Sequence, residues 1–137
     1  MILLDLDDGC PKEEACSLAE QARLLNQPHP VAIVLAYREY EAWFLASLET
    51  IAGNHYLPPD LRYEKDVEEK RGVKEWLTDQ MPPGQIYKPT IHQAKLANLI
   101  DLEIASQRSR SFRRLCNAIR ELVNAPHPRA HVTPRKC

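Results

Sequence analysis

The sequence predicts a mixed α/β protein: a strand, a crossover helix and a second strand, followed by a mainly helical C-terminal half. Two short apolar runs, within residues 2–6 and 31–36, are typical of strands that are buried on both faces. Residues 11–25 between them repeat apolar side chains at helical spacing, and so do several segments after residue 38. Strands joined by one crossover helix run parallel, so we expect a βαβ unit with parallel strands.

Turn and capping residues mark the ends of these first elements. The sequence Asp-Asp-Gly at residues 7–9 ends the first strand. Pro11 and the glutamates that follow it suit the first turn of the helix over residues 11–25. The β-branched residues of the run 31–36 favour a second strand.

The remainder of the chain predicts helices separated by one long loop. We expect a helix from Arg38 to about Ile51, a surface excursion over residues 53–72 and a short helix over residues 73–81. Thr90 opens another helix, with Gln93 in the reciprocal capping position. The apolar stripe of that helix is Leu96, Leu99, Ile100 and Ile104. A last helix over residues 112–123 has a clear apolar face, with its arginines largely off it.

Length and composition are those of one globular domain. The chain has 137 residues, of which 44% are hydrophobic and 27% are charged. No apolar run approaches the ~20 residues that span a bilayer, and the N-terminus has no signal-peptide pattern. We therefore expect a cytoplasmic protein without membrane contact, with a single domain over residues 1–125 and a flexible, proline-containing tail over residues 126–137.

Several classes of site are excluded or disfavoured by the sequence. Four isolated glycines exclude a Walker phosphate loop and a Gly-x-Gly-x-x-Gly dinucleotide turn. The four cysteines form no Cys-x-x-Cys pair, so we expect reduced thiols rather than a zinc site or a disulfide framework. The five histidines form no ligand set, and no grouping of serine, cysteine and histidine indicates a nucleophilic triad.

The predicted sheet is incomplete. Two strands that are apolar on both faces do not make a stable sheet alone. Either a partner chain, such as a second copy in a homodimer, completes the first strand, or residues that precede Met1 in a fuller form have been lost by truncation or a late start codon.

Carboxylates gather where the two predicted strands end. Asp5 and Asp7 are two residues apart, so at a strand end their side chains project to the same side. Glu39 and Glu41 follow the second strand, and ligands of open α/β sheets bind beyond the carboxyl ends of the strands. Oxygen ligands of this kind suit Mg²⁺ or Mn²⁺. The alternative is that Asp-Asp-Gly is only a turn and helix cap, but a carboxylate at Asp5, within an otherwise apolar strand, favours a bound cation.

Charge is distributed unevenly along the chain. Residues 1–20 hold six acids against Lys12 alone, a net charge of −5, whereas residues 108–137 hold eight basic residues against Glu121, a net charge of +7. The two ends could simply attract each other in the fold. The alternative is a cation site near one end and a nucleic-acid surface near the other. The candidate phosphate donors are Arg108, Arg110, Arg113 and Arg114, against the alternative of an ordinary solvated helix face.

The segment Ile-Leu-Leu-Asp-Leu-Asp-Asp-Gly-Cys-Pro at residues 2–11 resembles the Asp-x-Asp strand of Toprim domains, the metal-binding fold shared by type IA and type II topoisomerases, bacterial primases and overcoming-lysogenization-defect nucleases. Over about residues 2–123, the chain is similar to a Toprim-related bacterial family, domain of unknown function 4276. The blocks that carry this second resemblance are Arg-Glu-Tyr-Glu-Ala-Trp-Phe-Leu-Ala at 38–46, Lys-x-Trp-Leu at 74–77, Lys-Pro-Thr-x-x-Gln at 88–93 and Arg-Ser-x-Ser-Phe at 108–112.

The resemblance implies a Toprim-like unit and a Mg²⁺-dependent (or Mn²⁺-dependent) phosphodiester-cleaving site that acts on nucleic acid, with a separate ATPase as partner in phage defence. On that analogy Asp5 and Asp7 match the motif aspartates and Glu41 is the additional catalytic acid. Glu39 is a further candidate metal ligand by its position after the second strand. Toprim domains also carry a glutamate after an earlier strand, and this chain begins after the point where it would fall. We therefore expect this form to lack that strand and glutamate, with Glu39 or Glu41 as the alternative substitute.

Two functions of different class follow from these features. The first is a metal-dependent nuclease of Toprim type. The second is a non-catalytic interaction module, or a truncated and inactive form, that partners an ATPase. The Asp-x-Asp pair favours the first, and the absent early glutamate favours the second.

Overall fold

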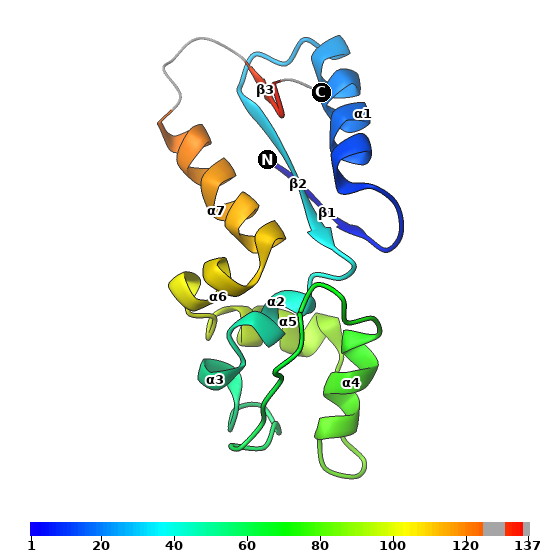
Figure 1. Ribbon diagram of the computed structural model, residues 1–137, viewed down its shortest axis with the longest axis vertical. Helices are drawn as coiled ribbons and strands as arrows, with labels where there is room; N and C mark the ends of the chain where they lie inside the picture. The colour runs from blue at the N-terminus through cyan, green and yellow to red at the C-terminus, as the bar shows by residue number, and fades with distance from the viewer. Residues whose placement is uncertain (125–130, 136–137) are drawn as a thin grey trace. The chain divides into compact units, whose positions relative to one another are not determined.

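A computed structural model describes residues 1–124 and 131–135 of the chain (Figure 1). The chain forms two compact units, which we describe separately. Unit 1 comprises Met1–Tyr37 and Ser111–Cys137, and unit 2 comprises Arg38–Arg110. Unit 1 contains the sheet, whereas the regular elements of unit 2 in the described chain are all helices.

Unit 1 is built on a parallel sheet with the strand order β1-β2-β3. Its elements are β1 (Ile2–Leu6), α1 (Pro11–Leu24), β2 (Val31–Tyr37), α7 (Arg110–Val123) and β3 (Val132–Thr133). The first residue of α7, Arg110, is counted with unit 2. The register pairs Ile2 with Ile33 and Leu6 with Tyr37 in the first ladder, and Val31 with Val132 in the second. These ladders confirm the predicted strand, helix, strand unit with parallel strands, and the chain is a mixed α/β protein.

The central strand β2 is covered on both faces. Leu6, Ile33 and Leu35 pack with Ala19 of α1 on one face. Ala32 and Val34 pack with Ala118 of α7 on the other. Figure 1 shows α1 and α7 on opposite sides of β2. The second strand is therefore apolar on both faces because both faces are buried, as predicted.

The first strand lies at an edge of the described sheet, and its expected burial on both faces is wrong for the chain alone. Its completion by a partner chain or by preceding residues stays a prediction. The side chain of Ile2 remains 38% exposed and that of Leu4 45% exposed. The reason is the position of α1, which packs mainly over β2 and β3 and leaves part of β1 uncovered.

Unit 2 has five short helices where fewer and longer ones were expected. They are α2 (Ala42–Ala46), α3 (Leu48–Ile51), α4 (Val73–Gln80), α5 (Pro89–Ala97) and α6 (Leu102–Arg108). The expectation of a single helix from Arg38 to about Ile51 is wrong. The helical segment begins only at Ala42, and a break at Ser47 divides it into α2 and α3. The hydroxyl of Ser47 accepts a hydrogen bond from the backbone N–H of Asp101 at 2.8 Å, a long-range contact that local periodicity does not reveal.

The helix expected to open at Thr90 and to carry a continuous stripe is also two helices. α5 begins at Pro89 with no side-chain cap and ends at Ala97, so the reciprocal capping role of Gln93 is wrong. α6 begins after Asp101, whose carboxylate accepts hydrogen bonds from the N–H groups of Glu103 and Ile104, both at 3.0 Å. The short helix expected over residues 73–81 is confirmed as α4. Residues 53–72 before it form no helix or strand, as expected, but they are not purely a surface excursion, because Leu57, Leu61 and Val67 are buried.

The aromatic residues after β2 belong to the core of unit 2. Trp43 is 1% exposed and Phe44 is not exposed at all. The ring of Tyr40 lies 5.0 Å from that of Trp43 and 5.7 Å from that of Phe44, measured between centroids. A base-stacking platform is therefore not formed by Trp43 and Phe44.

The C-terminal region contributes a strand that the sequence did not predict. Residues 132–133 form β3, although the segment was expected to be a loose tail. The rest of that predicted tail, at 126–130 and 136–137, lies outside the described residues, and the domain boundary at residue 125 stays a prediction. Every helix in the described part of the chain is too short or too polar to span a bilayer.

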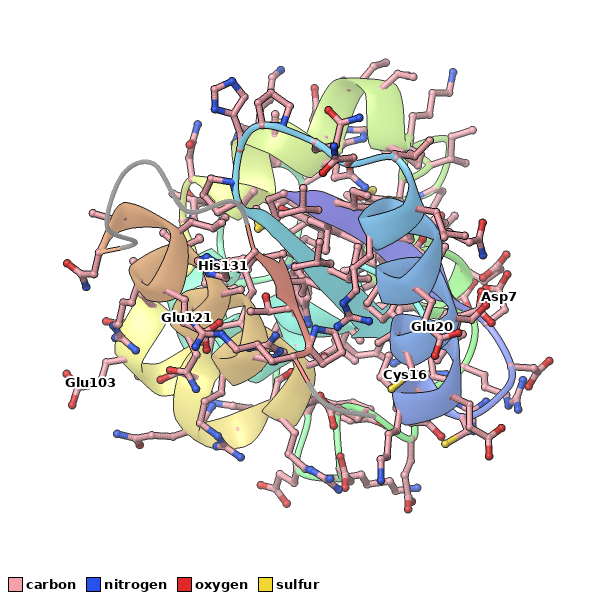
Figure 2. The ribbon with its side chains drawn as sticks, turned by 90° about the horizontal axis from the view of Figure 1, so that it is seen from above. Asp7, Cys16, Glu20, Glu103, Glu121 and His131 are labelled. Carbon is pink, nitrogen blue, oxygen red and sulfur yellow. The ribbon has the colours of Figure 1, made fainter. Side chains whose placement is uncertain are left out.

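The cysteines depart from the expectation at one position. Cys10 and Cys116 are free thiols. Cys16 lies on α1 (Figure 2). It is disulfide-bonded, so the expectation of reduced thiols is wrong for this residue. Cys137 lies outside the described residues. Spacing along the sequence does not show which cysteines the fold brings together.

Candidate functional site

Asp5 and Asp7 lie where β1 ends in unit 1. Asp5 is paired in register with Ala36 of β2, and Asp7 follows the last strand residue, Leu6. Both aspartates are exposed, and Figure 2 shows Asp7 on the loop between β1 and α1. Gly9, with φ of 115°, turns the chain toward α1. Because β1 and β2 are parallel, these carboxylates stand at the carboxyl edge of the sheet, as predicted.

The chemistry of this pair fits a magnesium ion. Mg²⁺ usually takes one or two protein carboxylates and fills its remaining positions with water or substrate phosphate. Asp5 and Asp7 supply such a donor set from exposed positions. Among residues 1–124 and 131–135, no three His, Cys, Asp or Glu side chains form a group that could hold a metal by themselves. A metal at this edge stays a prediction.

Glu39 caps a helix in unit 2. Its Oε1 accepts hydrogen bonds from the backbone N–H groups of Gly72 at 2.9 Å and Val73 at 3.3 Å, at the start of α4. Its Oε2 accepts from Nζ of Lys74 at 3.2 Å. A carboxylate at this position satisfies amides that have no partner within the helix and complements the helix dipole.

Glu41 is a completely buried carboxylate in the same unit. Its Oε1 accepts hydrogen bonds from the hydroxyl of Tyr87 at 2.9 Å and from Nε2 of Gln93 at 3.1 Å. Its Oε2 forms an ion pair with Nζ of Lys74 at 3.2 Å. Lys74 therefore bridges two carboxylates. We call the group of Glu39, Glu41, Lys74, Tyr87 and Gln93 the Lys74 cluster.

The protonation states in the Lys74 cluster follow from its geometry. Burial by itself lowers the pKa of Lys74, but the charge of Glu41 and hydrogen bonds to both carboxylates outweigh burial, so that pKa is raised. Burial raises the pKa of Tyr87, and the charge of Glu41 and the hydrogen bond to Glu41 raise it further. Lys74 thus remains an ammonium and Tyr87 a neutral hydroxyl donor across the physiological range.

The structure therefore groups the predicted acids into two pairs. Asp5 and Asp7 lie together in unit 1, and Glu39 and Glu41 lie together around Lys74 in unit 2. The predicted roles of Glu39 as a metal ligand and Glu41 as a catalytic acid stay predictions. Sequence reasoning missed Lys74 as the partner of both. The available signal was a pair of glutamates directly before a fully apolar run, since buried carboxylates need a cationic or hydrogen-bonding partner.

The predicted phosphate-binding arginines fall in two places. Arg108 and Arg110 line a cleft of about 730 Å³ in unit 2, which we call the arginine cleft. Its charged lining residues are Glu49, Arg62, Glu64, Lys65, Asp66, Glu68, Arg108 and Arg110. Nη1 of Arg108 lies 2.7 Å from Oε2 of Glu49, and this hydrogen bond lowers the pKa of Glu49. The cleft therefore holds acids and bases in equal number.

Arg113 and Arg114 lie on α7 in unit 1. Nη1 of Arg114 lies 3.4 Å from Oε1 of Glu121 in an exposed ion pair. Exposed pairs of this kind contribute little to stability, so Arg114 can exchange Glu121 for another anion at low cost. Binding of nucleic acid by any of these arginines stays a prediction.

Comparison with known proteins identifies a family but no characterised relative. A family model described as Domain of unknown function (DUF4276) matches residues 1–120. No curated protein and no solved structure matches the chain.

Proposed function

The chain belongs to the DUF4276 family, and we propose that it is a Toprim-like, Mg²⁺-dependent protein that cleaves phosphodiester bonds in nucleic acid. The observation that supports this proposal is the exposed pair Asp5 and Asp7 at the carboxyl edge of a parallel sheet. Substrates and cofactors of open α/β sheets bind at this edge. A turn-and-cap role does not account for Asp5, because it belongs to the strand and not to the turn.

In this proposal, Asp5 and Asp7 hold the cation through their carboxylate oxygens. A Mg²⁺ or Mn²⁺ ion bound there supplies an acidified water and neutralises charge on a phosphate. A divalent cation at this position would also screen the repulsion between the two neighbouring carboxylates. Glu39 and Glu41 are engaged in the Lys74 cluster, so the metal proposal rests on Asp5 and Asp7. The ATPase partner and a role in phage defence are part of the proposal through the resemblance to this Toprim-related family.

The test is a double variant, Asp5→Asn with Asp7→Asn, in the full chain. Mg²⁺ or Mn²⁺ should raise the melting temperature of the parent protein by mass action, and the variant should lose this response. Cleavage of DNA and RNA substrates should be lost with it. In the absence of metal, the variant should still unfold in one cooperative transition, which shows that a lost metal response is not a loss of the fold.

The matched control is Asp60→Asn with Asp79→Asn, which changes two exposed aspartates of unit 2 to the same residue type. It should keep the full response to metal. A parent-like response in the Asp5 and Asp7 variant would show that the metal binds elsewhere and would contradict the proposal.

A second candidate function is a non-catalytic interaction module for an ATPase partner. The observation that favours it is the uncovered edge of the sheet, where Ile2 and Leu4 expose apolar side chains. A parent protein that neither responds to metal nor cleaves nucleic acid would favour this candidate over the nuclease.

A further inference from the structure

A second pocket lies in unit 1, at the opposite end of the sheet from Asp5 and Asp7. Its volume is about 330 Å³. Figure 1 shows the end of α1 next to β3 at this end of unit 1, whereas the loop after β1 lies at the other end. The polar residues that line the pocket are Arg23, Asn26, Gln27, His29, His131 and Arg135. We call it the basic pocket.

The charge of the basic pocket has one sign. Two arginines and two histidines line it, and the lining residues within the described chain include no Asp or Glu. The arginine cleft of unit 2 differs, because its four basic side chains are matched by four acidic ones. The two guanidinium groups that share this cavity repel each other, and an anion between them would relieve that repulsion. The basic pocket therefore favours an anionic ligand.

Backbone and side-chain contacts hold the walls of the basic pocket together. The N–H of Val31 donates to the carbonyl of His131 at 2.8 Å, which joins the loop before β2 to the start of β3. Figure 2 shows His131 where the chain enters β3. The guanidinium of Arg23, on α1, donates to the carbonyl of Pro134. Three segments of chain are thus fastened to one another before a ligand arrives, which reduces the entropic cost of binding.

The simplest alternative to a ligand site is that the basic residues offset a helix dipole, and this explains only one of them. Arg23 lies in the last turn of α1, where a basic side chain offsets the negative end of the helix dipole. His29, His131 and Arg135 lie outside that helix, so the helix dipole does not account for their position. The contact with Pro134 engages one of the five N–H donors of Arg23.

We propose that the basic pocket binds a phosphoryl group. Guanidinium groups bind phosphate oxygens through paired, charge-assisted hydrogen bonds. The side-chain amides of Asn26 and Gln27 add neutral donors. The volume is at the lower end of the range for ligand pockets, about 300–1,000 Å³, which suits a small anion better than a large organic ligand. The phosphoryl group could come from a free phosphate compound or from the backbone of a nucleic acid. The proposal is independent of a metal at Asp5 and Asp7.

The test measures binding to the full chain by calorimetry and thermal shift, in buffers of equal ionic strength. The probes are inorganic phosphate, pyrophosphate and a short single-stranded oligonucleotide, with sodium chloride as the reference salt. Arg135→Gln and Arg23→Gln should each weaken binding of the phosphoryl probe by roughly tenfold or more, because each loses a charge-assisted hydrogen bond. Arg135→Gln is the decisive variant, since Arg135 is exposed and its loss should not disturb folding.

The control is Arg120→Gln, an exposed arginine of unit 1 outside the basic pocket. It should bind all probes as the parent does. If Arg135→Gln loses binding of phosphate and pyrophosphate, the ligand is a free phosphate compound. If it loses only the oligonucleotide, the ligand is a backbone phosphate. A parent that binds no probe, or an Arg135→Gln variant that binds each probe as tightly as the parent, would overturn the proposal.

Discussion

Glu41 is the residue whose environment departs most from its ordinary preference, because a glutamate is rarely fully buried. Its carboxylate is tolerated because three groups contact it: the ammonium of Lys74, the hydroxyl of Tyr87 and the amide of Gln93. A buried charge without such partners costs several kcal/mol. The residues that satisfy Glu41 are 33 to 52 positions away in the sequence, so the need for partners could be predicted but their identity could not.

Tyr87→Phe tests this residue-level account through pH. The variant should be less stable by about 1.5–3 kcal/mol at neutral pH, because a buried hydrogen bond to a charged group is lost. The pKa of Tyr87 is raised in the folded protein, so its proton stabilises the fold below the ordinary tyrosine value, about 10. That contribution is lost as the pH rises above that value. Urea unfolding should therefore show stability falling more steeply above about pH 10 in the parent than in Tyr87→Phe.

Tyr56→Phe is the control for this measurement. Tyr56 is 59% exposed, so its hydroxyl should contribute little to stability at neutral pH. An alkaline decline that is equally steep in the parent and in Tyr87→Phe would contradict the role of the Tyr87 proton. Some decline should persist in Tyr87→Phe, since the pKa of Lys74 is also raised and acts in the same direction.

At the scale of elements, local signals predicted some boundaries and long-range contacts changed others. β1, α1, β2 and α4 were predictable because the apolar pattern of each agrees with the turn or proline residues at its ends. The break at Ser47 was not, because it depends on a hydrogen bond to Asp101. Gln93 was expected to cap a helix and instead contacts Glu41. β3 has only two residues and pairs with a strand about a hundred positions earlier, so no periodicity could reveal it.

Asp101→Ala tests the cap that separates α5 from α6. The carboxylate of Asp101 accepts from two backbone N–H groups of the first turn of α6, so its removal should lower the free energy of unfolding by about 0.5–2 kcal/mol. Chemical denaturation measures this change. Asp60→Ala, at an exposed aspartate in a turn, should change stability by less than about 0.5 kcal/mol. Equal effects of the two substitutions would show that the cap contributes nothing specific.

For the whole molecule, the uneven charge along the sequence predicted a basic C-terminal region, but it did not predict the acidic residues that lie next to its arginines. Arg108 and Arg110 share their cleft with four acids, and Arg114 has an acidic partner on its own helix. Arg62, in the mixed-charge excursion, lines the same cleft as Arg108 and Arg110. This position could not be predicted, because the excursion has no helical or strand periodicity from which the direction of the Arg62 side chain could be inferred. A change at Arg62 is therefore unsuitable as a control for nucleic-acid binding.

The salt dependence of nucleic-acid binding tests the arginines of each unit separately. Each phosphate that a protein neutralises releases condensed counterions, so log affinity falls against log salt with a slope of roughly −0.7 to −0.9 per contact. We expect Arg108→Ala with Arg110→Ala to flatten this slope by about one to two units, and Arg113→Ala with Arg114→Ala to do the same. Arg71→Ala, at an exposed arginine that does not line the arginine cleft, should leave the slope unchanged. If only one double variant flattens the salt slope, the phosphate contacts belong to the unit that carries those two arginines, because each contact contributes separately to the slope. If neither double variant differs from the parent at any salt concentration, these arginines form a solvated surface held by their acidic neighbours, and nucleic acid must bind elsewhere on the chain.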